Sequence, residues 1–173
     1  LWLCALVYFC LVSGNATIAF WTPSVIQSLG VTDTMNIGLL ASIPFILGTV
    51  AMLWNGFHSD KTAERRLHCA MAALIAGLGL ICTGLFIGNA VMALIALTVA
   101  AMGILAAFPV FWSIPGAFLA GTAAAGGIAL INCIGNLAGF VAPYMIGWLK
   151  TLPGSLAAGL YLVAAFELLA GLL

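Results

Sequence analysis

The sequence predicts an all-α integral membrane protein, built as a bundle of six transmembrane helices. Of its 173 residues, 65% are hydrophobic and only 5% are charged, whereas a soluble globular protein carries about a quarter charged residues. A helix needs roughly 20 apolar residues to cross a bilayer, so the chain can hold six such helices with short connections. The apolar stretches are continuous and do not alternate with polar residues, which favours helices over the strands of a transmembrane barrel.

The composition argues against several other classes of protein. The formal net charge is zero and no basic stripe is present, so nucleic acid is not an expected partner. None of the five cysteines belongs to a CxxC pair or has metal-ligand spacing, and we expect them to be small core residues without a metal. No nucleophile is paired with a base at a common depth in the membrane, so we predict neither an enzyme nor a bound cofactor.

Residues 56–68 hold five of the eight charged side chains and orient the rest of the chain. In hydrocarbon these five would cost on the order of 12 kcal/mol, at roughly 2.5 kcal/mol each, so the segment must lie in water. Three of the four basic residues are here, and positive charge marks the cytoplasmic side of a membrane protein. We therefore predict a cytoplasmic loop at residues 58–68 and, with an even number of spans, both chain ends in the cytoplasm. The five charged residues are Asp60, Lys61, Glu64, Arg65 and Arg66.

The first three helices are predicted at residues 1–27, 37–57 and 69–87. Pro23 and Gly30 mark the outer end of the first helix, which carries a polar patch around Asn15. A short polar connection over residues 30–36 then lies outside the membrane. Pro44 is expected to kink the second helix, because proline cannot donate a backbone hydrogen bond. The third helix contains several glycines, which allow a neighbouring helix to approach closely.

The last three helices are predicted at residues 91–118, 123–149 and 156–173. Pro109 and Pro115 disturb the hydrogen bonding of the fourth helix, and such a helix at membrane depth needs protein or a water-filled cavity beside it. Residues 108–116 are therefore the best indication of a cavity in the sequence. A turn at residues 150–155 lies outside. The last helix includes Glu167, and an ionisable group inside a span is by default a functional candidate. We expect it instead near the cytoplasmic end with the carboxyl group reaching water, or paired in the full protein.

Four stretches of the chain resemble segments of a known family. They are Tyr8 and Phe9 with Phe-Trp-Thr-Pro at 20–23, His-Ser-Asp-Lys-Thr-Ala-Glu-Arg-Arg at 58–66, Phe-Trp-Ser-Ile-Pro at 111–115, and the glycine- and asparagine-containing stretch 121–150. They are similar to the seventh helix, the loop between helices eight and nine, the tenth helix and the eleventh helix of the anion:cation symporter family, within the major facilitator superfamily. The chain thus resembles the C-terminal six-helix half of a twelve-helix transporter, in which each half is a three-plus-three inverted repeat.

The resemblance implies a function and a partner. Carriers of this kind take up tartrate, rhamnonate, hexonates and other small organic anions by proton-coupled symport with alternating access, in the bacterial inner (plasma) membrane. The main partner, besides the lipid bilayer, would be the N-terminal six-helix half, which is absent here and would bear the substrate-binding arginine and the proton-titrating carboxylates. The coupling ion is expected to be H⁺. Because the chain opens and closes inside apolar stretches, we expect it to be a segment of a longer protein.

The resemblance also indicates candidate substrate contacts. Trp112 and Asn132 match positions that line the substrate cavity, the first covering the carbon skeleton and the second hydrogen-bonding a hydroxyl or carboxylate. Amides beside an aromatic face suit a polyhydroxy acid. Further candidates are Asn136, on the same helix face as Asn132, and Asn15, which stands where the family often has a tyrosine. The alternative is that the amides join helices and Trp112 only packs. A shared site requires Trp112 and Asn132 on one side of the bundle.

Asp60, Arg65 and Arg66 are interpreted as a conformational latch, in which a carboxylate at a helix end pairs with basic residues and releases them when the bundle rocks. The alternative is a solvated anchor that only sets the topology. His58 and His68 have no further ligand at metal spacing, so no metal site is expected. Two other functions stay open: a major facilitator carrier of another substrate class, such as a drug or a sugar, and a channel or structural membrane bundle.

Overall fold

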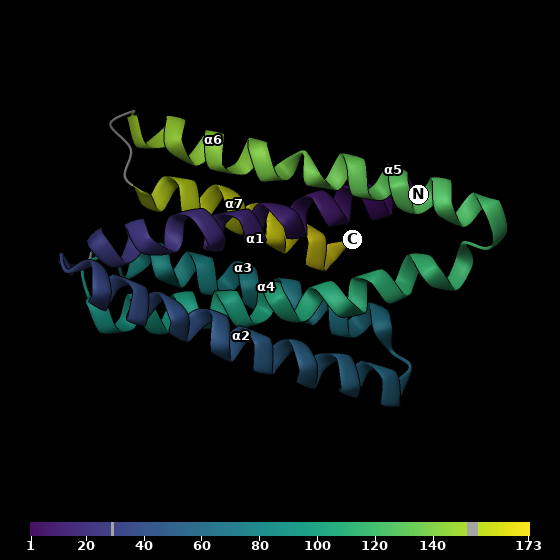
Figure 1. Cartoon of the computed structure of the whole chain (residues 1–173), viewed down its shortest axis with the longest axis horizontal. Coiled ribbons are helices and arrows are strands. Elements are labelled where there is room, and N and C mark those ends of the chain that lie inside the picture. Colours follow the sequence, from purple (N-terminus) through teal and green to yellow (C-terminus); the bar gives the residue numbers. More distant parts are fainter. Residues whose placement is uncertain (29, 152–155) are drawn as a thin grey trace.

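The computed structural model describes residues 1–28, 30–151 and 156–173, so most of the turn predicted at residues 150–155 lies outside the described residues. Within these ranges the chain forms seven α-helices and no strand, and the helices lie side by side in an elongated bundle (Figure 1). They are α1 (Trp2–Ser28), α2 (Thr34–Thr62), α3 (Arg65–Leu85), α4 (Ala90–Phe118), α5 (Gly121–Asn136), α6 (Ala138–Thr151) and α7 (Leu156–Leu172).

The helices of the described residues correspond to six crossings of a membrane. α1, α2, α3 and α4 are each long and apolar enough to cross, and α7 is a shorter apolar helix of 17 residues. α5 and α6 run on in one line (Figure 1) and together supply the apolar stretch Ala124–Thr151. Only the hydrogen-bond pattern changes between them, because the Leu137 N–H donates to the Ile134 carbonyl, three residues back instead of four. The chain is a multi-pass, all-α membrane protein.

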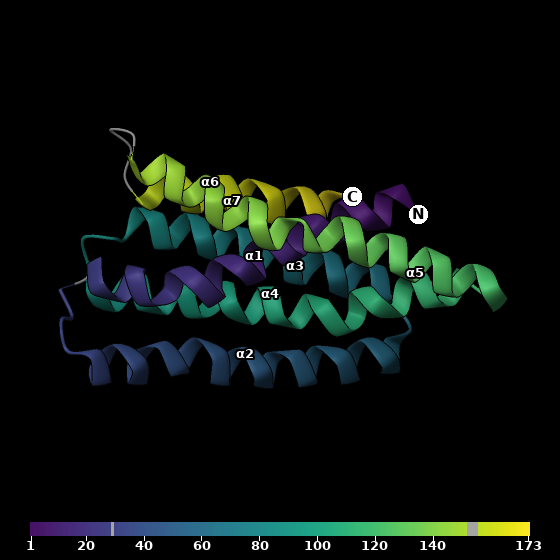
Figure 2. The same ribbon diagram turned by 45° about the horizontal axis from the view of Figure 1, so that its top comes forward.

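The two chain ends and the charged segment lie toward the same end of the bundle. In Figures 1 and 2 the N-terminus, the C-terminus and the connection between α2 and α3 are all toward the right. Successive crossings run in opposite directions, with the α5–α6 pair counting as one. This is the arrangement expected for an even number of crossings.

The structure corrects the predicted loop at residues 58–68. α2 continues to Thr62 and α3 begins at Arg65, which leaves only Ala63 and Glu64 between them. Ala63 ends α2 by taking a left-handed conformation with φ of 57°. The prediction was wrong because charged side chains keep a segment out of lipid without preventing it from being helical, since Lys, Arg and Glu are good helix formers. The helix ends therefore extend into water.

A seam of small residues joins α3 to α4 at the centre of the bundle. A Cβ atom added to Gly103 would lie 2.5 Å from the backbone nitrogen of Ala76, and one added to Gly79 would lie 2.6 Å from the backbone nitrogen of Ala100. The two helix backbones are therefore nearly in contact, as small residues allow in membrane proteins. Ala76 and Ala100 are completely buried. This seam fixes the position of α4, the helix that carries Trp112.

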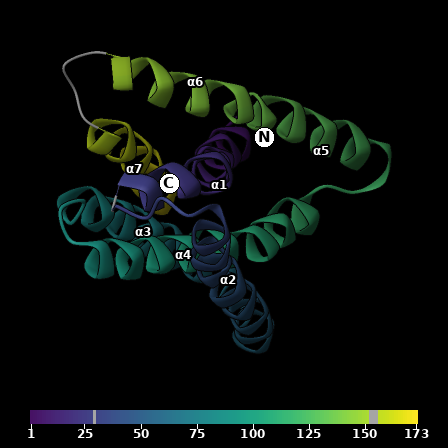
Figure 3. The same ribbon diagram turned by 60° about the vertical axis from the view of Figure 1, so that its left-hand side comes forward.

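The edges of the bundle are formed by α2 on one side and by α5 and α6 on the other, in both Figure 1 and Figure 2. Only 17% of the apolar stretch of α2 and 22% of that of α5–α6 is buried, against 56% for α1 and α4. α2 packs mainly on α4 and touches α3 little, and Figure 3 shows it extending away from α1 and α7. These two edges therefore present large apolar faces to lipid or to another protein segment.

Candidate substrate site

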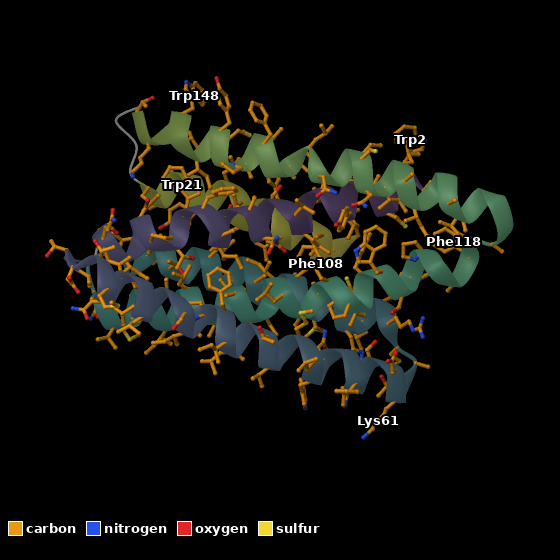
Figure 4. All side chains as sticks on the ribbon, viewed as in Figure 1. Trp2, Trp21, Lys61, Phe108, Phe118 and Trp148 are labelled. Atoms are coloured by element: carbon orange, nitrogen blue, oxygen red, sulfur yellow. The ribbon has the colours of Figure 1, made fainter. Side chains whose placement is uncertain are left out.

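An aromatic cluster around Tyr8 brings α1 and α4 together. The Tyr8 ring is stacked on Phe111 at 5.2 Å between centroids and meets Trp112 edge-on at 4.8 Å and Phe108 edge-on at 6.0 Å. Tyr8 and Phe111 are buried, while Trp112 is half-buried. Figure 4 shows Phe108 in the middle of the bundle. Trp112 thus keeps part of its indole surface accessible while the cluster holds the ring in place.

The helix that carries Asn132 and Asn136 reaches the same cluster. Gly135 of α5 faces Tyr8 so closely that a Cβ atom there would overlap the ring. Ile131, four residues earlier and so on the same helix face, is completely buried. Tyr8 therefore lies between α4 and α5, and the helices bearing Trp112 and Asn132 meet at one part of α1. The sequence placed Tyr8 only in a stretch that resembles the seventh helix of the family, and this bridging position was not foreseen.

Asn132 and Asn136 form an exposed amide pair on α5. The Asn136 Nδ2 group donates to the Asn132 Oδ1 atom at 2.6 Å and to the Asn132 backbone carbonyl at 2.8 Å. Each asparagine directly follows a residue that faces α1, so its side chain leaves the helix about 100° away from that packed face. Within the described residues, no hydrogen bond uses the Asn132 Nδ2 group or the Asn136 Oδ1 atom. The pair therefore still has a donor and an acceptor for a ligand.

Asn15 is half-buried on α1, seven residues from Tyr8 and therefore on nearly the same helix face. Its side chain makes no hydrogen bond within the described residues. An amide that the sequence analysis did not single out does join two helices: Asn55 of α2, which is 7% exposed, donates from Nδ2 to the Ala106 carbonyl of α4 at 2.9 Å. The signal that could have found it is the lone amide within the apolar stretch 37–57.

The residues of the predicted latch are only partly brought together. Arg65 places Nη2 3.7 Å from the Asp60 Oδ1 atom and donates from Nη1 to the Ser113 backbone carbonyl at 3.1 Å. It therefore connects the end of α2, the start of α3 and the last turns of α4. Arg66 makes no ion pair within the described residues. With side chains 43% and 69% exposed, the Arg65–Asp60 pair contributes at most about 1 kcal/mol to stability.

α4 stays helical through both of its prolines, and cavities border its last turns. One cavity of about 560 Å³ lies between the start of α3 and the end of α4, where Arg65, Arg66, Ser113 and Phe118 contribute to its walls. Of the segment 108–116, for which a cavity at membrane depth was predicted, Ser113 and Ile114 border this cavity, which lies at the helix end beside the cationic side chains.

The side chains of the two histidines, His58 and His68, contact each other. The Nδ1 atom of His58 lies 2.7 Å from the Nε2 atom of His68, and the Nδ1 atom of His68 lies 2.8 Å from the Glu64 carbonyl. No cluster of three potential metal ligands occurs within the part of the chain that the structure describes.

Glu167 does not lie where the sequence analysis expected it. Its exposed fraction is 0%, and the Oε1 atom lies against Gly14, in the volume that a Cβ atom would occupy there. Gly14 is near the midpoint of α1, so the carboxyl group is at mid-depth and does not reach water at a helix end. The expectation was wrong because the glycine on a neighbouring helix, which makes room for the carboxyl group, cannot be read from the sequence of α7.

Known proteins similar to this chain establish its family. The sequence matches the Major Facilitator Superfamily over residues 1–143. The chain belongs to the major facilitator superfamily. It is 44% identical over 173 residues to a protein named "Putative tartrate transporter" from Agrobacterium vitis, a match that covers 98% of this chain and 37% of that protein. The bundle of six crossings described above is accordingly half of a major facilitator fold.

Other relatives in this superfamily carry different names. A "Quinolone resistance transporter" from Acinetobacter baumannii is 39% identical over 144 residues, which cover 83% of this chain and 33% of that protein. The "Inner membrane transport protein RhmT" from Escherichia coli is 37% identical over 176 residues, covering 99% of this chain and 40% of the relative. The chain thus spans between a third and two fifths of the length of these proteins, and it is related to transporters, not to enzymes.

Proposed function

We propose that this chain is the C-terminal half of a proton-coupled symporter for small organic anions, such as tartrate or sugar acids, in the bacterial inner membrane. The observation that carries the substrate class is the exposed amide pair of Asn132 and Asn136, on a helix that meets Trp112 through Tyr8. The similarity to a protein named as a tartrate transporter supports the same class.

The chemistry of this region suits a polyhydroxy acid. Such a molecule has hydroxyl and carboxylate groups that need both donors and acceptors, and a C–H face that packs on an aromatic ring. The amide pair supplies the first kind of contact and the half-buried indole of Trp112 the second, with Asn15 as an additional amide on α1. Among the described residues, none of those that form this region is a cation, so the charge of the substrate would be neutralised by an arginine of the other half.

The mechanism that fits the fold is alternating access. In this mechanism two six-helix halves rock against each other around a site near the midplane. The apolar faces of α2 and α5–α6, at opposite edges of the bundle, are the surfaces we assign to contact with the N-terminal half. Asp60 and Arg65 would act as the latch at the cytoplasmic end, with Arg66 as a second cation beside the same cavity. Both ends of this segment would be cytoplasmic.

The test uses the full-length protein containing this segment, reconstituted in proteoliposomes. With an inward proton gradient, labelled tartrate or an aldonate should accumulate above its external concentration, and a protonophore should abolish that accumulation. Uptake that saturates and follows the pH gradient supports a symporter. Flux that is linear in concentration and indifferent to pH would instead indicate a channel, and absence of any organic-acid flux would refute the proposal.

A drug transporter is the second candidate, favoured by the 39% identity to a protein named for quinolone resistance. The same proteoliposomes distinguish the two candidates when a fluoroquinolone replaces the organic acid. Because a fluoroquinolone is a large, flat and mainly aromatic ligand, it would depend on Trp112 and Tyr8 and not on the Asn132–Asn136 pair.

A further inference from the structure

Glu167 of α7 is a buried acid for which the proposed substrate site has no use. Both of its carboxyl oxygens lack a hydrogen-bond partner among the described residues, and the side chain is completely buried. An ionisable group at mid-depth in a membrane bundle is costly, and it commonly marks an ion or proton pathway. Glu167 therefore needs an explanation of its own.

The described residues around the carboxyl group carry no positive charge. Gly14 of α1 touches it, and Ile104 of α4 approaches the same point. The titratable groups within electrostatic range are two thiols, Cys10 of α1 and Cys69 of α3, and α7 itself adds none within one turn.

The basic residues of the chain form no ion pair with this carboxyl group among the described residues. They lie at positions 61, 65, 66 and 150, close to helix ends. Among the described residues the one ion pair joins Arg65 to Asp60. Among the described residues Glu167 thus has no cation beside it, and the backbone N–H of Gly14, next to the carboxyl group, makes no hydrogen bond of ordinary geometry with it.

A carboxylate anion in a dry interior is strongly disfavoured without such a partner. The arrangement in this structure is therefore the one that a proton-bound, neutral carboxyl group can occupy. Release of the proton as hydronium requires water to reach Oε1 or Oε2, and that requires α1 and α7 to separate where they touch at Gly14. Rebinding of a proton allows the two helices to close again. Proton occupancy and the spacing of α1 and α7 are linked in this way.

We propose that Glu167 is a proton-binding site of this bundle, and that its occupancy sets the position of α1 at Gly14, next to Asn15. This inference rests on the proposed function, because the linked movement would act on the α1 amide that faces the substrate. It adds a proton site in this half to those that the family resemblance implies for the other half.

The test is the variant Glu167→Gln in the full-length protein, with Glu64→Gln, an exposed acid of the connection between α2 and α3, as the matched control. Gln keeps the shape of the side chain and cannot release a proton. For Glu167→Gln we expect accumulation of tartrate or an aldonate driven by a pH gradient to fall by about tenfold, within the range of a typical coupling free energy. Exchange of labelled for unlabelled substrate without a gradient should persist, and Glu64→Gln should behave like the unmodified protein. Unchanged gradient-driven accumulation in Glu167→Gln would overturn the inference.

A second variant covers the case in which Glu167→Gln does not fold. Gly14→Ala places a Cβ atom where Oε1 lies, and Gly38→Ala is the control because nothing lies within 4 Å of a Cβ atom at that position. Gly14→Ala should shift the pH dependence of exchange, and Gly38→Ala should leave it unchanged. The same pH dependence in both variants would count against the inference.

Infrared difference spectroscopy separates this inference from the proposed function. The unmodified protein should show the C=O band of a protonated carboxyl group at neutral pH. This band should be missing in Glu167→Gln and present in the control Glu64→Gln. If the unmodified protein transports no organic acid, the proposed function fails while the band still reports the proton site. If the band is absent, the proton site fails whatever the substrate is.

Discussion

The variant Gly103→Ala tests the close contact between α3 and α4. A Cβ atom at this position would lie 2.5 Å from the Ala76 backbone nitrogen and 2.6 Å from the Ala72 carbonyl oxygen. Since non-bonded heavy atoms reach optimal contact at about 3.5 to 4.0 Å, the two backbones would have to separate by about 1 Å. Backbone atoms cannot move aside as a flexible side chain can, so the cost should resemble that of overpacking a core, about 1 to 3 kcal/mol.

The matched control for Gly103→Ala is Gly116→Ala on the same helix, where nothing lies within 4 Å of an added Cβ atom. Ala is a better helix former than Gly by about 1 kcal/mol, so the control should be neutral or slightly stabilising. The assay is denaturant-induced unfolding of the full-length protein in detergent micelles, followed by tryptophan fluorescence. If the two variants differ in unfolding free energy by less than about 0.5 kcal/mol, the typical effect of a neutral substitution, the small-residue seam does not hold α3 and α4 as closely as described.

Three further predictions concern the site and its supports. Asn132→Ala and Asn136→Ala should each raise the KM for an organic acid by about tenfold, the equivalent of one lost hydrogen bond, in a transport assay; an unchanged KM in both would remove the amide pair from the site. Asp60→Asn should lower the maximal uptake rate and leave the KM unchanged. In a double-mutant cycle, adding Arg65→Ala should lower the rate little further, whereas additive losses of rate would show that the two residues are not a coupled latch. Asn55→Ala should lower the unfolding free energy by about 0.6 to 1.7 kcal/mol, because it removes a hydrogen bond between α2 and α4. An Asn55→Ala variant as stable as the unmodified protein would show that this bond contributes nothing.

Hydropathy alone predicted most of the fold. The apolar stretches, interrupted by Asp33 and by the charged residues near position 60, leave room for only a small set of crossings, and a backbone in lipid has to be helical or a closed barrel. The ends of the helices were predicted less well. A stretch such as Asp60 to Arg66 is excluded from lipid by its charge, yet whether it is coiled or helical depends on local backbone preferences, here the left-handed turn at Ala63.

The candidate site was predicted unevenly for a similar reason. The family resemblance indicated Asn132, with Asn136 and Asn15 as further amides inside apolar stretches, and their contact with a substrate stays a prediction. Asn55 is also an amide inside an apolar stretch, but its bond to the Ala106 carbonyl depends on the neighbouring helix and could not be read from the sequence of α2.

The positions of Tyr8 and Glu167 depend on glycines far away in the chain. Gly135 makes room for the Tyr8 ring, and Gly14 makes room for the Glu167 carboxyl group. A glycine has no side chain, so the sequence does not reveal which residue of another helix fills the space that a Cβ atom would occupy.

The two-residue link of Ala63 and Glu64 has a consequence for how α2 can move. α2 packs little on α3, so its first turns are free to tilt against that neighbour. At the other end, however, Ala63 and Glu64 keep the last turn of α2 beside the first turn of α3, and Arg65 ties both to α4. Any tilt of α2 must therefore pivot at this connection, and the displacement is largest at the first turn of α2, at the opposite end of the bundle.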